Sequence, residues 1–146
     1  MEELIEQMKI LLADTFAFYL QAHYYHWNVE GPDFKQYHEL FGEIYKETHG
    51  AVDQIAEHIR ALDAYVPGSF ERFSTLTTIR GDNTIRSALG MIRELLEDNG
   101  LVMVSLRRAY TAAGQTGEIG LSNFLQDRYD AHTKHQWMLR STLKVQ

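Results

Sequence analysis

Two histidines and two carboxylates in the first half of the chain are the side chains best suited to binding a transition metal. They are His26, His38, Asp53 and Glu57. Imidazole nitrogen binds iron, zinc and copper, and carboxylate oxygen adds hard ligands. Whether the four can reach one ion depends on how far apart their positions lie.

His38, Asp53 and Glu57 fall on one predicted helix. From Phe34 to Leu62 apolar residues recur three or four apart with no internal proline, as in an amphipathic helix. Asp53 and Glu57 are one turn apart and can share a ligand. At about 1.5 Å of rise per residue, His38 lies roughly 22 Å from Asp53 along the axis. One helix therefore cannot bring His38 to these carboxylates.

If the four residues form one site, the carboxylates must meet histidines from another segment or another copy of the chain. Two copies of this helix that cross antiparallel at their middles would place His38 of one beside Asp53 and Glu57 of the other. Isologous two-fold contacts of this kind are the commonest in soluble oligomers. His26 precedes the turn at 28–32 and can fold back beside His38. The spacing thus predicts two equivalent metal sites between subunits.

Several motifs over nearly the whole chain resemble the Dps family of ferritin-like mini-ferritins, and their spacing matches that family: HWNVEGPDF, HELF, DQIAEHIRAL, VPGSF and WMLRSTL. The resemblance implies a ferritin-like four-helix subunit and a hollow homododecamer. It also implies a ferroxidase that oxidises Fe(II), typically with hydrogen peroxide, and stores Fe(III) in the shell. His26, His38, Asp53 and Glu57 would be the catalytic and iron-binding residues of sites at the two-fold interfaces. The expected role is iron storage and protection against oxidative damage.

Gly42 departs from the pattern of that family. Four residues after His38, Dps-type chains usually carry Asp or Glu on the same helix face, whereas this chain has glycine. Glu43 is adjacent but points about 100° away. We therefore expect a second iron position that is weaker than usual. The alternative is a cage whose ferroxidase site is nearly inactive.

Trp27 and the five other histidines are not part of the predicted metal site. By the resemblance, Trp27 would donate electrons to radicals at the metal, whereas packing at a subunit contact explains it equally well. Ordinary surface or interface positions are expected for His23, His49 and His58, and structural positions for His132 and His135, which lack an acidic partner at suitable spacing.

Length and composition indicate a single domain over residues 1–146, with 45% hydrophobic and 23% charged residues. The resemblance implies that this domain is ferritin-like. Cysteine is absent, which excludes disulfides and thiolate metal ligands. No apolar run is long enough for a membrane span and the acidic N-terminus is a poor signal peptide, so we expect a cytoplasmic protein.

A net charge of −6 favours metal cations over DNA phosphates. DNA binding is expected to be weak or absent, with a DNA-coating Dps protein as the alternative.

The hydrophobic pattern predicts an all-α fold. Long helices are expected over 1–25, 34–62, 82 or 83 to 113, and 121–144, with Asp33 and either Asp82 or Asn83 as N-caps. Asn99 and Gly100 suggest a bend or break in the third of these. One long connection joins helices two and three, as in some four-helix bundles. The resemblance places a short helix within it, at about 70–78.

Overall fold

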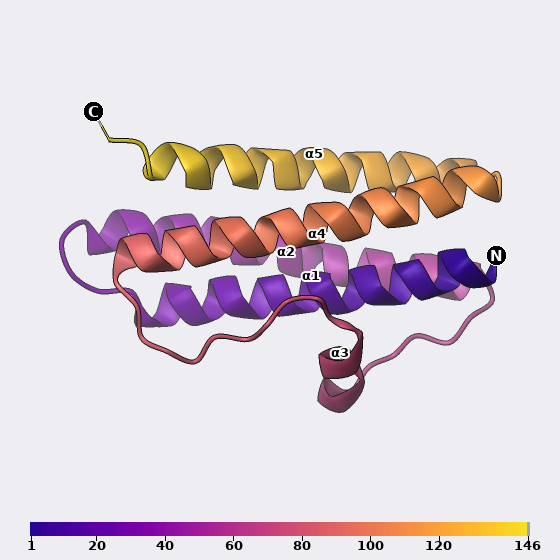
Figure 1. Ribbon diagram of the computed structural model, residues 1–146, viewed down its shortest axis with the longest axis horizontal. Coiled ribbons are helices and arrows are strands. Elements are labelled where there is room, and N and C mark those ends of the chain that lie inside the picture. Colours follow the sequence, from indigo (N-terminus) through magenta and orange to yellow (C-terminus); the bar gives the residue numbers. More distant parts are fainter. Residues whose placement is uncertain (146) are drawn as a thin grey trace.

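The computed structural model describes residues 1–145, and within that range five helices are present. Four long helices lie side by side in a bundle, and a short one lies outside it (Figure 1). Their bounds are α1 (Glu2–Asn28), α2 (Phe34–Ala61), α3 (Phe70–Leu76), α4 (Ala88–Gln115) and α5 (Ile119–Thr142). The predicted all-α bundle, with a short helix between its second and third long helices, is confirmed. No helix among these residues is long and apolar enough to cross a membrane.

The core is built from the apolar stripes of the long helices. On α2, Phe41, Ile44, Ile55 and Ile59 are buried at helical spacing, and corresponding stripes on the other three helices meet them. Burying an apolar side chain of this size contributes about 1.5–3 kcal/mol. Packing of these stripes therefore holds together helices that would be marginal in isolation.

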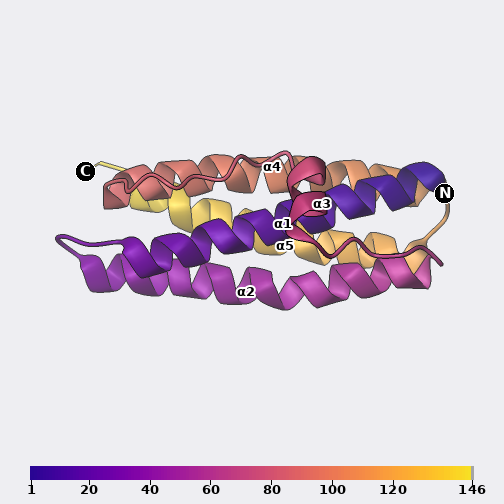
Figure 2. The ribbon, with the colours of Figure 1, turned by 90° about the horizontal axis from the view of Figure 1, so that it is seen from below.

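The turn between α1 and α2 reverses the chain and so places the end of α1 beside the start of α2 (Figure 2). Gly31 and Asp33 both have positive φ, at 103° and 63°, with Pro32 between them. A left-handed conformation costs glycine nothing, and aspartate tolerates it better than most residues. Asp33 occupies the predicted N-cap position, but its side chain makes no capping hydrogen bond.

The third long helix begins later than predicted. Neither Asp82 nor Asn83 caps it; α4 starts at Ala88, and the Ser87 hydroxyl accepts the capping hydrogen bond. The carboxylate of Asp82 instead accepts a 3.0 Å hydrogen bond from the Tyr25 hydroxyl on α1. The other oxygen of Asp82 accepts from the amide of Thr84 at 3.0 Å, so this carboxylate forms a local turn and does not begin a helix.

Asn99 and Gly100 do not break α4, which continues through both. The Asn99 side chain is fully buried and bonds to α5. Its amide nitrogen donates to the carbonyl of His132 at 2.9 Å, and its oxygen accepts from Nδ1 of the same histidine at 2.7 Å. These two hydrogen bonds to α5 hold the chain in the helix at a position where local sequence favours a turn.

A polar cluster with two buried members, Arg128 and His135, joins α2 to α5. Arg128 donates two hydrogen bonds to Glu47, one of them at 3.0 Å, and Nε2 of His135 lies 2.8 Å from the same carboxylate. Burial alone would raise the pKa of Glu47, but the bonds from His135 and Arg128 outweigh it and hold that pKa well below its usual range. His132 and His135 were predicted to be structural, without an acidic partner at suitable spacing, yet His135 has one in Glu47. Its partner comes from a helix distant in sequence, which spacing cannot reveal.

Asp98 on α4 has a buried carboxyl group, and one of its oxygens accepts no hydrogen bond among the described residues. Only 3% of the residue is exposed, and within residues 1–145 its Oδ2 has no hydrogen-bond partner. Burial, followed by the negative charges of Glu94 and Glu97, raises the pKa of Asp98 to about 7. The folded protein thus binds a proton here that the unfolded chain releases above about pH 4.

Asp98→Asn is expected to stabilise the protein at pH 8 and to do so much less at pH 5. A carboxyl whose pKa is raised by folding costs most above the folded value, and this cost disappears as the pH falls toward the unfolded value. The difference between the two pH values should be on the order of 2 kcal/mol. Thermal unfolding of both proteins at each pH measures it. Glu71→Gln, an exposed carboxylate on α3 that does not contribute to the shift at Asp98, is the control, and an equal shift at both pH values would contradict the prediction.

Candidate metal site

The rings of His26, near the end of α1, and His38, in the first turns of α2, stack on each other. Their centroids are 3.7 Å apart and their planes differ by 16°. Both residues are partly buried. The prediction that His26 folds back beside His38 is confirmed, because the turn at 29–33 sets the two helices antiparallel at this level.

Each ring is fixed by the backbone of the other residue. Nδ1 of His26 lies 2.7 Å from the carbonyl oxygen of His38, and Nδ1 of His38 lies 2.7 Å from the carbonyl oxygen of His26. A carbonyl only accepts, so both Nδ1 atoms must carry the proton. When the rings are neutral, the lone pair of each is therefore on Nε2. This arrangement, with Nδ1–H bonded to a carbonyl, is the usual one for a metal-binding imidazole.

Asp53 and Glu57 lie farther along α2 and are both exposed. Among residues 1–145, no three His, Asp or Glu side chains converge closely enough to hold a metal ion. One chain therefore brings the two histidines together but does not bring them to the two carboxylates, in line with the separation of roughly 22 Å expected from helical rise. A site with all four residues remains a prediction that requires a second copy.

Gly42 lies directly against the His26 ring. It is buried on α2, one turn after His38, and an ideal Cβ added there would be 3.2 Å from both Cε1 and Nδ1 of His26. Glu43, the nearest carboxylate in sequence, is exposed. The space that a side chain at position 42 would need is thus next to the imidazole of His26.

Aromatic rings extend the histidine pair along α1 and α2. The His23 ring is stacked on Tyr45 at 3.8 Å, Tyr45 lies 5.2 Å from His26, and Trp27 lies 4.1 Å from His23. Trp27 is 58% exposed, so its own chain covers only part of the ring. Burial, then the positive charges of His26 and His49, lower the pKa of His23. The neutral form of His23 is therefore favoured where its ring lies between Tyr45 and Trp27.

His49 and His58 contact aromatic rings and have no acidic hydrogen-bond partner within residues 1–145. The His49 ring is 4.7 Å from Tyr19 on α1, and the His58 ring is 4.4 Å from Phe124 on α5. His49 is exposed and His58 is partly buried. Both fit the surface or interface positions predicted for them.

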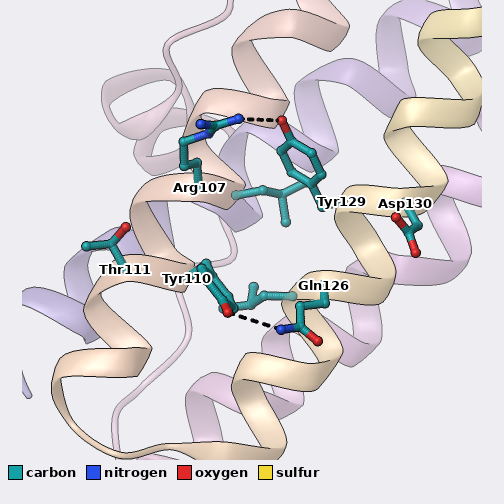
Figure 3. A pocket seen from close by; sticks show the side chains of 8 residues that line it. Arg107, Tyr110, Thr111, Gln126, Tyr129 and Asp130 are labelled. Atoms are coloured by element: carbon teal, nitrogen blue, oxygen red, sulfur yellow. Dashed lines mark hydrogen bonds between the residues drawn. The ribbon is translucent and has the colours of Figure 1, made fainter.

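A surface groove lies between α4 and α5 (Figure 3). Its polar side chains bond to one another: Arg107 donates to the Tyr129 hydroxyl at 2.8 Å, and Gln126 donates to the Tyr110 hydroxyl at 3.1 Å. The groove contains no histidine and no nucleophile paired with a base. It offers no chemistry comparable to that of the stacked imidazoles.

Comparison with known proteins gives full-length matches. A family model described as the ferritin-like domain matches residues 5–145. A low temperature-induced protein of Nostoc sp. is 34% identical over 92% of this chain and 76% of its own length. DNA protection during starvation protein 2 of Bacillus anthracis is 29% identical over 97% of both. The crystal structure of a Vibrio cholerae Dps protein, described as a member of a superfamily of ferritin-like diiron-carboxylate proteins, superimposes with a TM-score of 0.93. It is 29% identical over 98% of this chain and 90% of that one.

Proposed function

Since the chain belongs to the ferritin-like family and is of the Dps type, we propose that it is an iron-sequestering mini-ferritin. It oxidises Fe(II) at sites shared between subunits and stores Fe(III) inside a hollow shell, which protects the cell against iron and peroxide. The oxidant is hydrogen peroxide. The assembly is a homododecamer in the bacterial cytoplasm, with His26, His38, Asp53 and Glu57 as the iron ligands.

The observation that carries this proposal is the orientation of the two imidazoles. Both Nδ1 atoms are held by carbonyl oxygens at 2.7 Å, so both Nε2 lone pairs remain for a metal ion. Fixing ring and tautomer in advance avoids an ordering cost when the metal binds. A purely structural histidine pair would not need both rings fixed in the same tautomer.

The proposed reaction removes one electron from each of two Fe(II) ions and gives both to one peroxide molecule, whose O–O bond breaks. With two further waters the products are two FeOOH and four protons. Imidazole and carboxylate ligands suit Fe(II), and the negative carboxylates of Asp53 and Glu57 stabilise the extra charge of Fe(III). Because the electrons reach peroxide in pairs, little hydroxyl radical is released.

Gly42 supports a proposal of unequal iron positions. With no carboxylate at position 42, the second iron is held by His38 and water and binds more weakly than the first. A cage whose oxidation is slowed by this loss is the second candidate function. The two candidate functions use the same iron ligands and differ in the rate of Fe(II) oxidation.

DNA coating is the less favoured alternative. The protein carries a net charge of −6, and the first turn of α1 holds Glu2 and Glu3. Phosphate binding requires clustered Lys and Arg to release counterions. We therefore expect no DNA retardation at 150 mM salt in a gel shift, and a retarded band that disappears with added salt would favour the alternative.

The direct test of the proposed function is Fe(II) oxidation. Purified protein is loaded anaerobically with Fe(II), hydrogen peroxide or oxygen is added, and the absorbance of Fe(III) is followed against protein-free buffer. Rapid oxidation by peroxide, slower oxidation by oxygen and a soluble product are expected. A rate equal to that in buffer, with iron precipitating, would overturn the enzymatic proposal.

A further inference from the structure

Gly42 lies on α2 beside a ring of the candidate metal site. Of the described glycines, it is the only one where an added Cβ would meet such a ring. An ideal Cβ at position 42 would lie 3.2 Å from Cε1 and Nδ1 of His26. Such a contact is shorter than ordinary carbon packing, so the ring would have to move by a few tenths of an ångström. By contrast, a Cβ at Gly50 on the same helix or at Gly100 on α4 would meet nothing within 4 Å.

The His26 ring has little freedom to move away. The His38 ring is stacked on it at 3.7 Å, and the Tyr45 ring lies 5.2 Å from it. Its Nδ1 is held at 2.7 Å from the carbonyl oxygen of His38. A displacement that relieves the contact with position 42 lengthens or bends this hydrogen bond, which fixes the tautomer of the ring.

We propose that Gly42 is a positioning residue for metal capture, because its lack of a side chain lets His26 adopt the ring orientation that presents Nε2. The proposal rests on the proposed function for the identity of the site. It changes the interpretation of Gly42: the glycine is not only a missing ligand. A side chain at position 42 would displace the His26 ring from its present orientation, so this chain binds one well-held metal ion at its histidine pair.

A further consequence concerns restoration of the acid found in related chains. Gly42→Asp adds a ligand of the right type, yet its Cβ meets the same two atoms of His26. We expect this substitution to weaken metal binding rather than to create a second strong position. The simple view of Gly42 as a lost ligand predicts the reverse.

The experiment compares wild type, Gly42→Ala, Gly42→Asp and the control Gly100→Ala. Zn²⁺ serves as a redox-inactive probe that accepts histidine and carboxylate ligands. Calorimetric titration is expected to show about one tightly bound Zn²⁺ per subunit in wild type and in Gly100→Ala. A loss of affinity of about tenfold or more is expected for both variants at position 42, the size typical when support of a metal-binding histidine is removed.

Nitrogen NMR of the imidazoles in the metal-free protein tests positioning separately from binding. Wild type and Gly100→Ala are expected to show His26 protonated at Nδ1, with slow exchange of that proton. Gly42→Ala is expected to lose this signature while its helical circular dichroism is unchanged. An unchanged His26 spectrum in Gly42→Ala, or a second tight Zn²⁺ in Gly42→Asp, would overturn the inference.

The two proposals fail in different ways. If wild type binds no Zn²⁺, the metal site fails, yet the NMR comparison still decides whether Gly42 positions His26. If wild type binds Zn²⁺ and Gly42→Ala binds it equally well, the metal site stands and the role of Gly42 is rejected. Unfolding of Gly42→Ala would be seen in its circular dichroism, and Gly42→Ser then repeats the test with a side chain of similar size.

Discussion

Co-expression of two inactive variants is expected to restore about a quarter of the wild-type Fe(II) oxidation. One variant carries His26→Ala and His38→Ala, and the other carries Asp53→Ala and Glu57→Ala. Each alone is expected to oxidise Fe(II) no faster than protein-free buffer. The recovery follows from the geometry of a two-fold interface, where every site takes its histidines from one chain and its carboxylates from the other.

The fraction follows from random pairing. Half of the two-fold contacts then join unlike chains, and one of the two sites at each such contact contains four unaltered ligands. The described residues of a single chain do not bring the four side chains together, so no site within one chain can be rebuilt by mixing. The readout is the initial rate of Fe(III) formation with peroxide, per subunit, at equal expression of both chains.

His58→Ala is the matched control for this experiment. His58 adjoins Glu57 on α2, but its ring packs on Phe124 of the same chain, so its removal should leave the rate near that of wild type. Co-expression without recovery, while each assembly remains intact, would place the whole site inside one chain. Full activity of the His26 and His38 double variant would place it elsewhere.

Local periodicity predicted much of the fold because burial dominates it. The stripe on α2 begins at Phe34, and the helix begins there as well. The turn at Gly31 and Pro32 was also visible in the sequence, and it was enough to predict that His26 lies beside His38. Both inferences depend only on neighbours within a few turns, and such neighbours can be judged from residue spacing.

Errors arose where a side chain finds its partner on a distant helix. Asp82 was expected to cap a helix, but it accepts a hydrogen bond from Tyr25. Asn99 was expected to interrupt α4, but two hydrogen bonds to His132 hold it in place. No acid at suitable spacing was found for His135, and its partner Glu47 lies on a helix distant in sequence. Polar residues with these propensities signal turns and caps only while their side chains bond locally.

The candidate site was predictable in part for the same reason. The histidine pair forms within one chain and is present in the structure, whereas the meeting with Asp53 and Glu57 needs a second copy. The space at Gly42 is a third case. Sequence showed that an acid is missing there, but only the coordinates show that the His26 ring uses the room.

Asp14→Ala is expected to lower the free energy of unfolding by about 3 kcal/mol, the largest loss from any single polar substitution in this chain. Asp14 on α1 is fully buried and accepts four hydrogen bonds. Thr77 and Thr78, just after α3, supply three of them at 2.6, 2.6 and 2.8 Å. Ser105 on α4 supplies the fourth. One carboxylate therefore attaches the long connection to two helices of the bundle.

The size of the loss follows from what alanine leaves behind. The Ser105 hydroxyl is buried and would lose its acceptor, as would the amide of Thr78. A hydrogen bond to a charged acceptor contributes about 1.5–3 kcal/mol, and a buried donor left unpaired costs about 1–3 kcal/mol. Four such bonds to one group are not additive, which is why the expected total is below their sum.

Thermal and urea unfolding of Asp14→Ala, Ser105→Ala and the double variant measure this coupling. Ser105→Ala should cost about 1 kcal/mol in wild type and much less when Asp14 is already absent, because the acceptor has gone. Hydrogen exchange of the Thr78 amide should accelerate in Asp14→Ala, since its acceptor is removed. Zn²⁺ binding should persist, because Asp14 lies at the middle of α1 and His26 lies about three turns further along it. Strictly additive losses, or an unchanged Thr78 amide, would show that Asp14 does not hold the connection to the bundle.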